Sequence, residues 1–188
     1  MNEIKNLAKK YNLKVEFEEI DVSSIKFDVR VRWKCMFGCE SYGKKSCPPY
    51  VPDFEDCIKL VKSYKKAYLF KFKVKNLNDV KKAQEFMLEA ERITKKPYAL
   101  ATFPGGCILC DKECKQNCTK ARPSLTALCI DSTQFNLSND EMVAILFIEW
   151  FIIHLGYRSN MVVELRGHHL ICLHFFTVDP KVKYLAIE

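Results

Sequence analysis

Four cysteines within twelve residues constrain this chain more than any other feature of its sequence. Two glycines precede them, and the residues between them are mainly charged or polar. The four are Cys107, Cys110, Cys114 and Cys118. A cysteine that only fills space in a core prefers apolar neighbours, so packing does not explain this density of thiols. The spacing therefore predicts that these side chains bind a metal.

A second group of cysteines lies earlier in the chain, in a segment with two glycines and three prolines. Its members are Cys35, Cys39 and Cys47. Glycine and proline at this density indicate a loop. Pro48 and Pro49 follow the third cysteine and restrict the backbone there. We interpret the group as a three-thiolate site, and the alternative is three small cysteines packed in an irregular loop.

The start of the chain decides how the ten cysteines are interpreted. Its first seven residues are charged and amphipathic and lack the apolar core of a secretory signal, so we expect a cytoplasmic protein. In a reducing compartment, clustered cysteines are more often metal ligands than disulfide partners. The net charge of +7 is spread along the chain without a groove-reading motif, so we do not expect nucleic-acid binding.

Hydrophobic periodicity predicts an α/β or α+β fold, with a small central sheet, flanking helices and two cysteine-rich loops. Helices are expected over residues 3–11, 54–64 and 78–95, and near Pro123. Strands are expected over residues 15–18, 25–34, 66–74 and 98–103. On this pattern each cysteine group follows a strand and precedes a helix. Parallel strands would bring both groups to one edge of the sheet.

We expect a metal-binding domain over residues 1–131 and a helical C-terminal appendage over residues 132–188. A capping box at Ser138–Glu141 and the apolar run after it predict a helix over 139–155. This run is shorter than the ~20 residues of a membrane span, so membrane insertion is not expected. An exposed helix this apolar requires a contact with a partner or with the same chain.

A further set of metal-ligating residue types remains open. Cys57 lies on the apolar side of the expected helix 54–64, which favours a core position, and Cys129 lies in an apolar segment. The region 161–188 is interpreted as a truncated second module. Its candidate ligands are His168, His169, Cys172 and His174.

The two cysteine groups and the segment after them resemble an uncharacterised family of predicted metal-binding proteins. The resemblance rests on the spacing of the seven cysteines, on Ser46–Pro49, and on Ala121–Asp131, and it covers about residues 10–131. It implies a cytosolic iron-sulfur protein without an assigned reaction or substrate. Residues 161–178 resemble the start of a second uncharacterised iron-sulfur family, whose cysteine-rich part lies further downstream.

Four thiolates bind either zinc or an iron-sulfur cluster. The spacing C-x2-C-x3-C-x3-C is close to the bacterial ferredoxin run C-x2-C-x2-C-x3-C-P. Zinc modules usually present two C-x2-C pairs, and only Cys107 and Cys110 form one here. A 4Fe-4S cluster is therefore favoured, with zinc as the alternative. If the first group binds a cluster through three thiolates, one iron stays open to a ligand.

The predicted function is electron transfer or redox chemistry at one or two iron-sulfur clusters, together with a redox partner protein. The alternative is a zinc-stabilised module that docks a protein or nucleic acid. The chain has no nucleophile elbow, P-loop, dinucleotide fingerprint or zinc-protease motif. The sequence therefore identifies no enzymatic reaction.

Overall fold

A four-stranded antiparallel sheet lies at the centre of the described residues, which are 2–110, 114 and 118–149 of this computed structural model. The sheet consists of β1 (Val15–Ile20), β2 (Lys66–Lys73), β3 (Leu100–Ala101) and β4 (Glu141–Ile148), in the order β1-β2-β4-β3. The helices are α1 (Asn2–Tyr11), α2 (Val29–Met36), α3 (Phe54–Ser63) and α4 (Leu77–Ile93). Two 3-10 helices, η1 (Val22–Ser24) and η2 (Ser132–Phe135), complete the elements.

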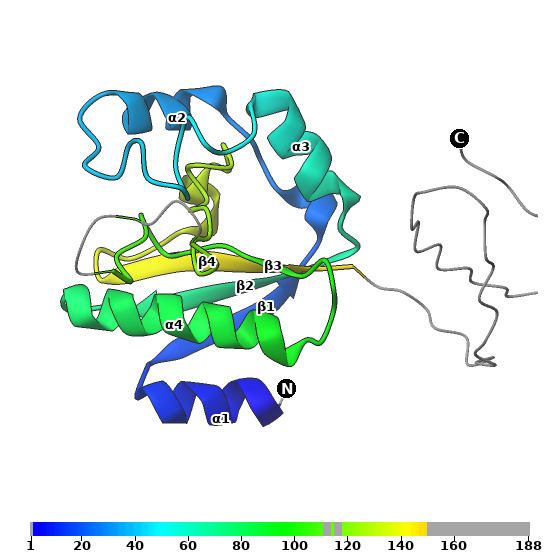
Figure 1. Ribbon diagram of the computed structural model, residues 1–188. Coiled ribbons are helices and arrows are strands. Elements are labelled where there is room, and N and C mark those ends of the chain that lie inside the picture. Colours follow the sequence, from blue (N-terminus) through cyan, green and yellow to red (C-terminus); the bar gives the residue numbers. More distant parts are fainter. Residues whose placement is uncertain (1, 111–113, 115–117, 150–188) are drawn as a thin grey trace, which may run out of the picture. The chain divides into compact units, whose positions relative to one another are not determined.

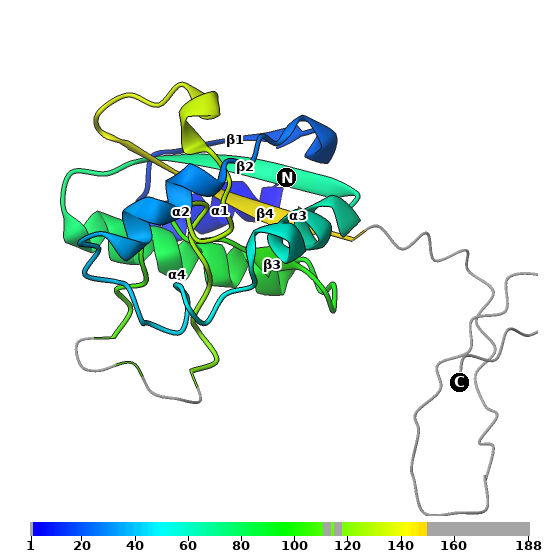
Figure 2. The same ribbon diagram turned by 90° about the horizontal axis from the view of Figure 1, so that it is seen from above.

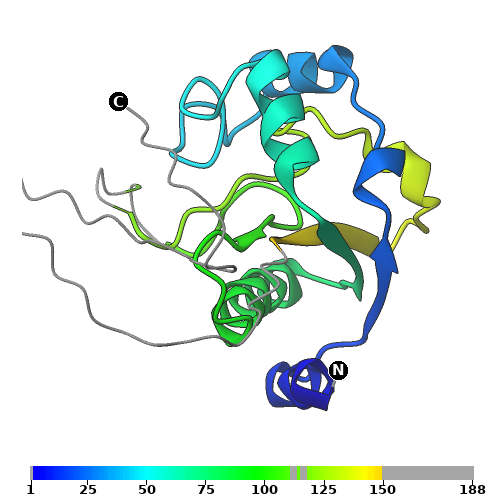
Figure 3. The ribbon, with the colours of Figure 1, turned by 90° about the vertical axis from the view of Figure 1, so that its right-hand side faces the viewer.

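Both faces of the sheet are covered (Figures 1 and 3). On one face α1 and α4 pack against a core that includes Phe70 of β2 and Leu146 of β4. On the other face α3 and the chain around residues 125–130 pack against Leu69 and Ile145. Figure 2 shows α2 and α3 from above, on the second face. The sheet is thus the middle layer of the described part.

The α+β class is confirmed, and so are the helices and strands whose signals are local. α1, α3 and α4 lie where periodicity places them, and Asp53 and Asn76 cap the latter two by accepting hydrogen bonds from main-chain N–H groups. β1 and β2 also lie at the predicted positions. β3 is shorter than the predicted 98–103, because only two of its residues pair with β4.

The strand predicted over residues 25–34 is wrong, because α2 occupies most of this segment. Asp28 begins the helix by accepting a hydrogen bond from the N–H of Arg30. Phe27 forms only an isolated bridge with Ile130, so no neighbouring strand was available to hold ten residues in extended form. The first cysteine group therefore begins in the last turn of a helix rather than at the end of a strand.

The helix predicted over residues 139–155 is also wrong over the described part, where residues 141–148 form β4. β4 pairs with β2 on one side and β3 on the other. A strand that is buried on both faces loses the alternation of apolar and polar residues, so its sequence looks like a buried helix. Glu141 does accept a hydrogen bond from the N–H of Ser138, but this contact shapes the turn before β4.

The compact unit that contains the sheet runs from Met1 to Trp150, so residues 132–149 contribute to the same core. Residues 150–155 and the region 161–188, with its candidate ligands, lie outside the described residues.

The helix expected at Pro123 is replaced by turns, and Cys129 has a φ of 60°. None of the helices in the described ranges is long and apolar enough to cross a membrane.

Candidate metal centre

The first cysteine group surrounds the C-terminal end of α2. Cys35 is buried in the last turn of the helix, Cys39 is exposed in the loop after it, and Cys47 is buried further along that loop. Burial raises the pKa of the Cys35 thiol, and negative charge on Cys39 and Cys47 raises it further. The three sulfur atoms are therefore close enough to affect one another's ionisation.

The second group follows β3. Cys107 is half-buried beside the core under α4, and Cys110 and Cys114 are exposed. Burial raises the pKa of Cys107, and charges on Cys110, Cys118 and Cys114 also raise it, against a lowering by a hydrogen bond from the N–H of Leu109. The four predicted ligands of this group thus also lie within electrostatic reach of one another.

The two cysteine loops contact each other. Gly106 packs so tightly on Ser41 that a Cβ atom at this position would overlap the Ser41 hydroxyl and lie 2.8 Å from its Cβ. A charge on Cys114 contributes to the raised pKa of Cys47, after burial and the charge on Cys39. Figure 1 shows the loop after α2 and the segment after β3 at the same end of the sheet. The expected convergence is present, but it arises from a helix end and an antiparallel sheet.

Gln84 of α4 holds the chain that leads into the second group. Its side chain is fully buried, and its amide nitrogen donates hydrogen bonds to the carbonyl oxygens of Pro104 (3.3 Å) and Gly106 (2.8 Å). Its amide oxygen accepts a hydrogen bond from the N–H of Ile108 at 2.9 Å. One side chain therefore satisfies the main chain on both sides of Cys107.

Glu91 of the same helix holds the chain that leaves the second group. Its carboxylate accepts hydrogen bonds from Nε and Nη2 of Arg122, at 2.8 Å and 2.5 Å. Arg122 in turn donates to the carbonyl oxygen of Thr119, next to Cys118. Both side chains of the ion pair are largely buried, with 23% and 14% exposure. A bidentate pair in this setting fixes orientation as well as position.

Cys57 and Cys129 form a separate buried pair beside Arg32. Nη2 of Arg32 donates hydrogen bonds to Cys57 Sγ (3.3 Å) and to the carbonyl oxygens of Pro52 and Ala127. The hydrogen bond with Cys129, together with Arg32, lowers the pKa of Cys57. The same thiol–thiol hydrogen bond and burial raise the pKa of Cys129, against a lowering by the charge of Arg32. A guanidinium beside a thiol repels a metal cation, so this arrangement disfavours Cys57 as a ligand.

The donor chemistry of the two groups fits a thiophilic metal. Seven thiols lie on two touching loops, and the raised pKa of Cys35, Cys47 and Cys107 reflects burial and mutual repulsion that a bound cation would offset. Within residues 2–110, 114 and 118–149, however, no three His, Cys, Asp or Glu side chains are drawn together around one point. Metal binding requires deprotonated thiolates, so a bound cation would displace the thiol protons and draw these side chains together.

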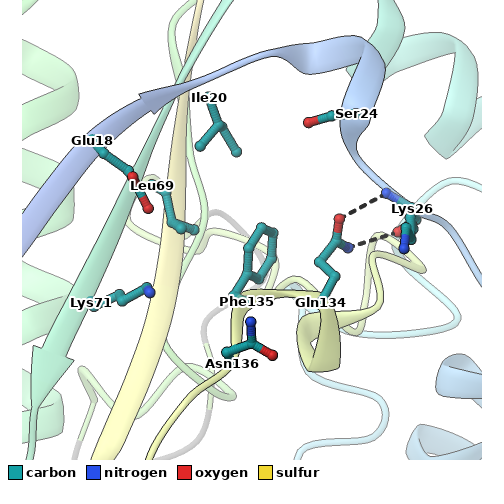
Figure 4. Close-up of a pocket in the computed structure, with 9 residues that line it drawn as sticks. All are labelled: Glu18, Ile20, Ser24, Lys26, Leu69, Lys71, Gln134, Phe135 and Asn136. Atoms are coloured by element: carbon teal, nitrogen blue, oxygen red, sulfur yellow. Dashed lines mark hydrogen bonds between the residues drawn. The ribbon is translucent and has the colours of Figure 1, made fainter.

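A pocket of about 350 Å³ lies elsewhere, between the β1–β2 side of the sheet and η2 (Figure 4). Its wall includes Ile20, Leu69 and Phe135, and its rim includes Glu18 and Lys71. Gln134 closes one end by exchanging two hydrogen bonds with the main chain of Lys26. No cysteine lines this pocket, and it takes no part in the candidate metal centre.

Sequence reasoning found the cysteines but missed the residues that hold them. Gln84 stands between buried apolar positions of α4, and a polar residue in that register was a signal of a buried hydrogen-bonding role. Arg122 and Glu91 are thirty-one positions apart, and no local pattern connects them. Arg32 looked like a polar residue of a strand, so its buried contacts were not predictable.

A helix-covered antiparallel sheet that presents seven thiols on two touching loops defines a candidate metalloprotein. The comparison with protein families agrees, because residues 18–145 match the family described as "Predicted metal-binding protein (DUF2284)". The match covers most of the chain, and the chain belongs to this family. No curated protein and no solved structure matches the chain significantly. The match does not extend to residues 161–178.

Proposed function

We propose that this protein binds iron-sulfur clusters and uses them for electron transfer or redox chemistry in the cytoplasm. The observation that carries the proposal is the contact between Gly106 and Ser41, which places two thiol-rich loops side by side. Iron-sulfur clusters are held by cysteine thiolates, and a bound cluster supplies one-electron transfer. The family itself implies a metal without specifying which one.

In this proposal Cys107, Cys110, Cys114 and Cys118 bind a 4Fe-4S cluster. The ferredoxin-like spacing supports a cluster over zinc. Gln84 and the Glu91–Arg122 pair hold both ends of the loop, so the ligands lose less freedom when the metal binds.

Cys35, Cys39 and Cys47 form the second site of the proposal. They supply three thiolates, and the two further cysteines of the described residues, Cys57 and Cys129, are already engaged with each other and with Arg32. A cluster bound by three protein ligands has one iron open to a substrate or small ligand. This site is therefore where chemistry would occur, whereas the four-cysteine site would relay electrons.

Anaerobic purification followed by iron, zinc and acid-labile sulfide analysis tests the proposal. We expect a brown protein with about four irons and four sulfides for each cluster. Cys107→Ser and Cys118→Ser should reduce the iron content of the four-cysteine site, and Cys35→Ser and Cys47→Ser that of the other. Cys57→Ser serves as the matched control and should leave iron content unchanged.

Zinc without sulfide would overturn the iron-sulfur proposal and select the alternative, a zinc-stabilised binding module. Loss of all metal in both sets of cysteine variants would show that the two groups form a single site. Loss of iron in the Cys57→Ser control, with folding retained, would show that the Cys57–Cys129 pair supplies a ligand.

A further inference from the structure

An apolar stripe runs along the exposed side of α2. Val29, Trp33 and Met36 follow one another at helical spacing, and Phe37 continues the stripe at the C-cap. The Trp33, Met36 and Phe37 residues are 61%, 55% and 76% exposed. The rings of Trp33 and Phe37 meet edge to face, with centroids 6.4 Å apart. Helices that lie on a core normally turn such a stripe inward.

The stripe continues into the loop that carries the first cysteine group. Tyr42 and Tyr50 are 45% and 59% exposed. Six of the eight large exposed apolar side chains in the described part belong to this one stretch of chain. We call the following six residues the α2 surface: Val29, Trp33, Met36, Phe37, Tyr42 and Tyr50. An exposed set of this kind, gathered in one segment, marks an interaction site.

Positive charge surrounds the α2 surface. Lys34 stands beside the stripe on the helix, and Lys44 and Lys45 stand between the two tyrosines in the loop. Arg30, also on the helix, is paired with the carboxylate of Asp28. The ammonium group of Lys45 lies 4.4 Å from the centroid of the Tyr50 ring. Glu40 is the acidic residue between Phe37 and Tyr50. The rim is therefore basic and suits a partner with carboxylates around an apolar centre.

The α2 surface also encloses the first cysteine group in the chain. Cys35 is buried on the side of α2 away from solvent, and the exposed Cys39 lies between Phe37 and Tyr42. A partner seated on this surface would lie next to the three-cysteine site. The rest of the exposed apolar residues, Leu77 and Tyr98, belong to α4 and to the chain before β3.

We propose that the α2 surface docks a small acidic electron-carrier protein against the three-cysteine site. This inference rests on the proposed redox function and adds the partner and the place of contact. Cys35, Cys39 and Cys47 would hold the iron centre, which would accept one electron from the reduced carrier, with no atom transferred. Interfaces of electron carriers are small, which matches a surface formed by one helix and one loop.

The composition of the surface favours a protein partner over a nucleic acid. Single-stranded nucleic acid binds to aromatic platforms along a basic groove. Here aliphatic Val29 and Met36 share the stripe with the aromatic rings. Neither the pocket beside η2 nor a second pocket lined by Lys14, Lys73 and Glu141 includes a residue of the α2 surface. Trp, Tyr, Met and Arg are the residues enriched at the centres of protein interfaces.

Calorimetric titration of the full chain with an acidic ferredoxin, and separately with an acidic flavodoxin, tests the proposal. We expect binding in 20 mM salt that weakens in 200 mM salt, because exposed charges are screened. Trp33 and Phe37 contribute little to the core, so the double variant Trp33→Ala/Phe37→Ala should fold normally and bind at least about tenfold more weakly. The matched control, Leu77→Ala/Tyr98→Ala, removes two equally exposed side chains elsewhere and should bind as the parent does.

Iron analysis of the same samples separates the two proposals. Protein that contains iron and sulfide but binds neither carrier overturns the docking proposal and leaves the redox function intact. Protein that contains zinc alone but still binds the carriers through Trp33 and Phe37 supports the surface and overturns the redox function. Stronger binding to a single-stranded RNA oligonucleotide than to either carrier, or self-association through the α2 surface, also overturns the docking proposal.

Discussion

Gly106 is the residue at which the two cysteine loops touch, and its hydrogen side chain is required by the Ser41 side chain opposite. We predict that Gly106→Ala lowers the free energy of unfolding by about 1–3 kcal/mol, as overpacking usually does. It should also reduce metal content, because the loops must separate to admit the methyl group. Urea unfolding and metal analysis of the purified variant measure both effects.

Ser41→Gly provides the matched test of this explanation. Removing the Ser41 side chain makes room for the methyl group, so the double variant Gly106→Ala/Ser41→Gly should recover most of the lost stability and metal. If the double variant is as damaged as Gly106→Ala alone, the loop contact is not the cause.

The Cys57–Cys129 pair predicts a pH dependence of stability. The hydrogen bond from Cys129 and the nearby Arg32 lower the pKa of Cys57 from about 9 to about 7 in the folded protein. Between pH 7 and pH 9 the unfolded chain therefore binds more protons than the folded one, and stability rises with pH, by about 1–2 kcal/mol in total. Above pH 9 the raised pKa of Cys129 reverses the trend.

Urea unfolding at pH 7, 8 and 9 measures this rise. In Cys57→Ser the group that ionises is absent, so the increase between pH 7 and pH 9 should disappear. An unchanged slope in the variant would mean that other groups cause the dependence.

At the scale of elements, α4 serves as the support of the four-cysteine loop. Gln84 and Glu91 lie two turns apart on the same side of the helix and hold the two ends of the loop. We predict that Gln84→Ala costs about 1–3 kcal/mol, because main-chain groups around Cys107 lose their buried partner. Metal bound by the four cysteines should become easier to remove, which a chelator time course measures.

Glu85→Ala is the control for this prediction, since Glu85 is the exposed neighbour of Gln84 on the same helix. It should leave both stability and the rate of metal loss unchanged. Equal metal loss in Glu85→Ala and Gln84→Ala would show that α4 contributes only through its overall stability.

The elements that the sequence predicts correctly are those determined by neighbouring residues. α1, α3 and α4 have a helical apolar side, and the latter two have a capping residue, while β1 and β2 are recognised by their short apolar or alternating runs. α2 and β4 were mispredicted because their state depends on distant partners. β4 is a strand only because β2 and β3 flank it.

The same difference between local signals and distant contacts decides how much of the candidate site is predictable from the sequence. The cysteine spacing is a local signal and identifies both groups. The contacts that position them, such as Gly106 with Ser41 and Glu91 with Arg122, join residues far apart in the chain. Such contacts follow from the tertiary fold, which periodicity and spacing do not specify.

At the scale of the whole molecule, the core and the metal centre are largely separate. The two apolar clusters on the faces of the sheet consist of fully buried residues such as Phe70, Phe86 and Phe147. We predict that removing the metal with a chelator leaves the far-ultraviolet circular dichroism nearly unchanged. Limited proteolysis should then cut within residues 36–50 and 104–122, because metal no longer holds the cysteines of each segment together.

The metal-loaded protein under the same protease is the control and should stay intact at both loops. Global unfolding on metal removal would contradict the prediction and would make the metal a structural part of the core, as in zinc-dependent domains.

The place of β4 in the sheet has a consequence for how the protein is made. β4 is inserted between two strands that precede it in the chain, and β3 has no partner other than β4 in the described sheet. During translation, β2 and β3 therefore cannot pair with β4 until residues 141–148 have left the ribosome. The sheet is complete only after that. The seven candidate ligands, from Cys35 to Cys118, are synthesised earlier but reach their final positions later, so metal binding should follow release of this strand.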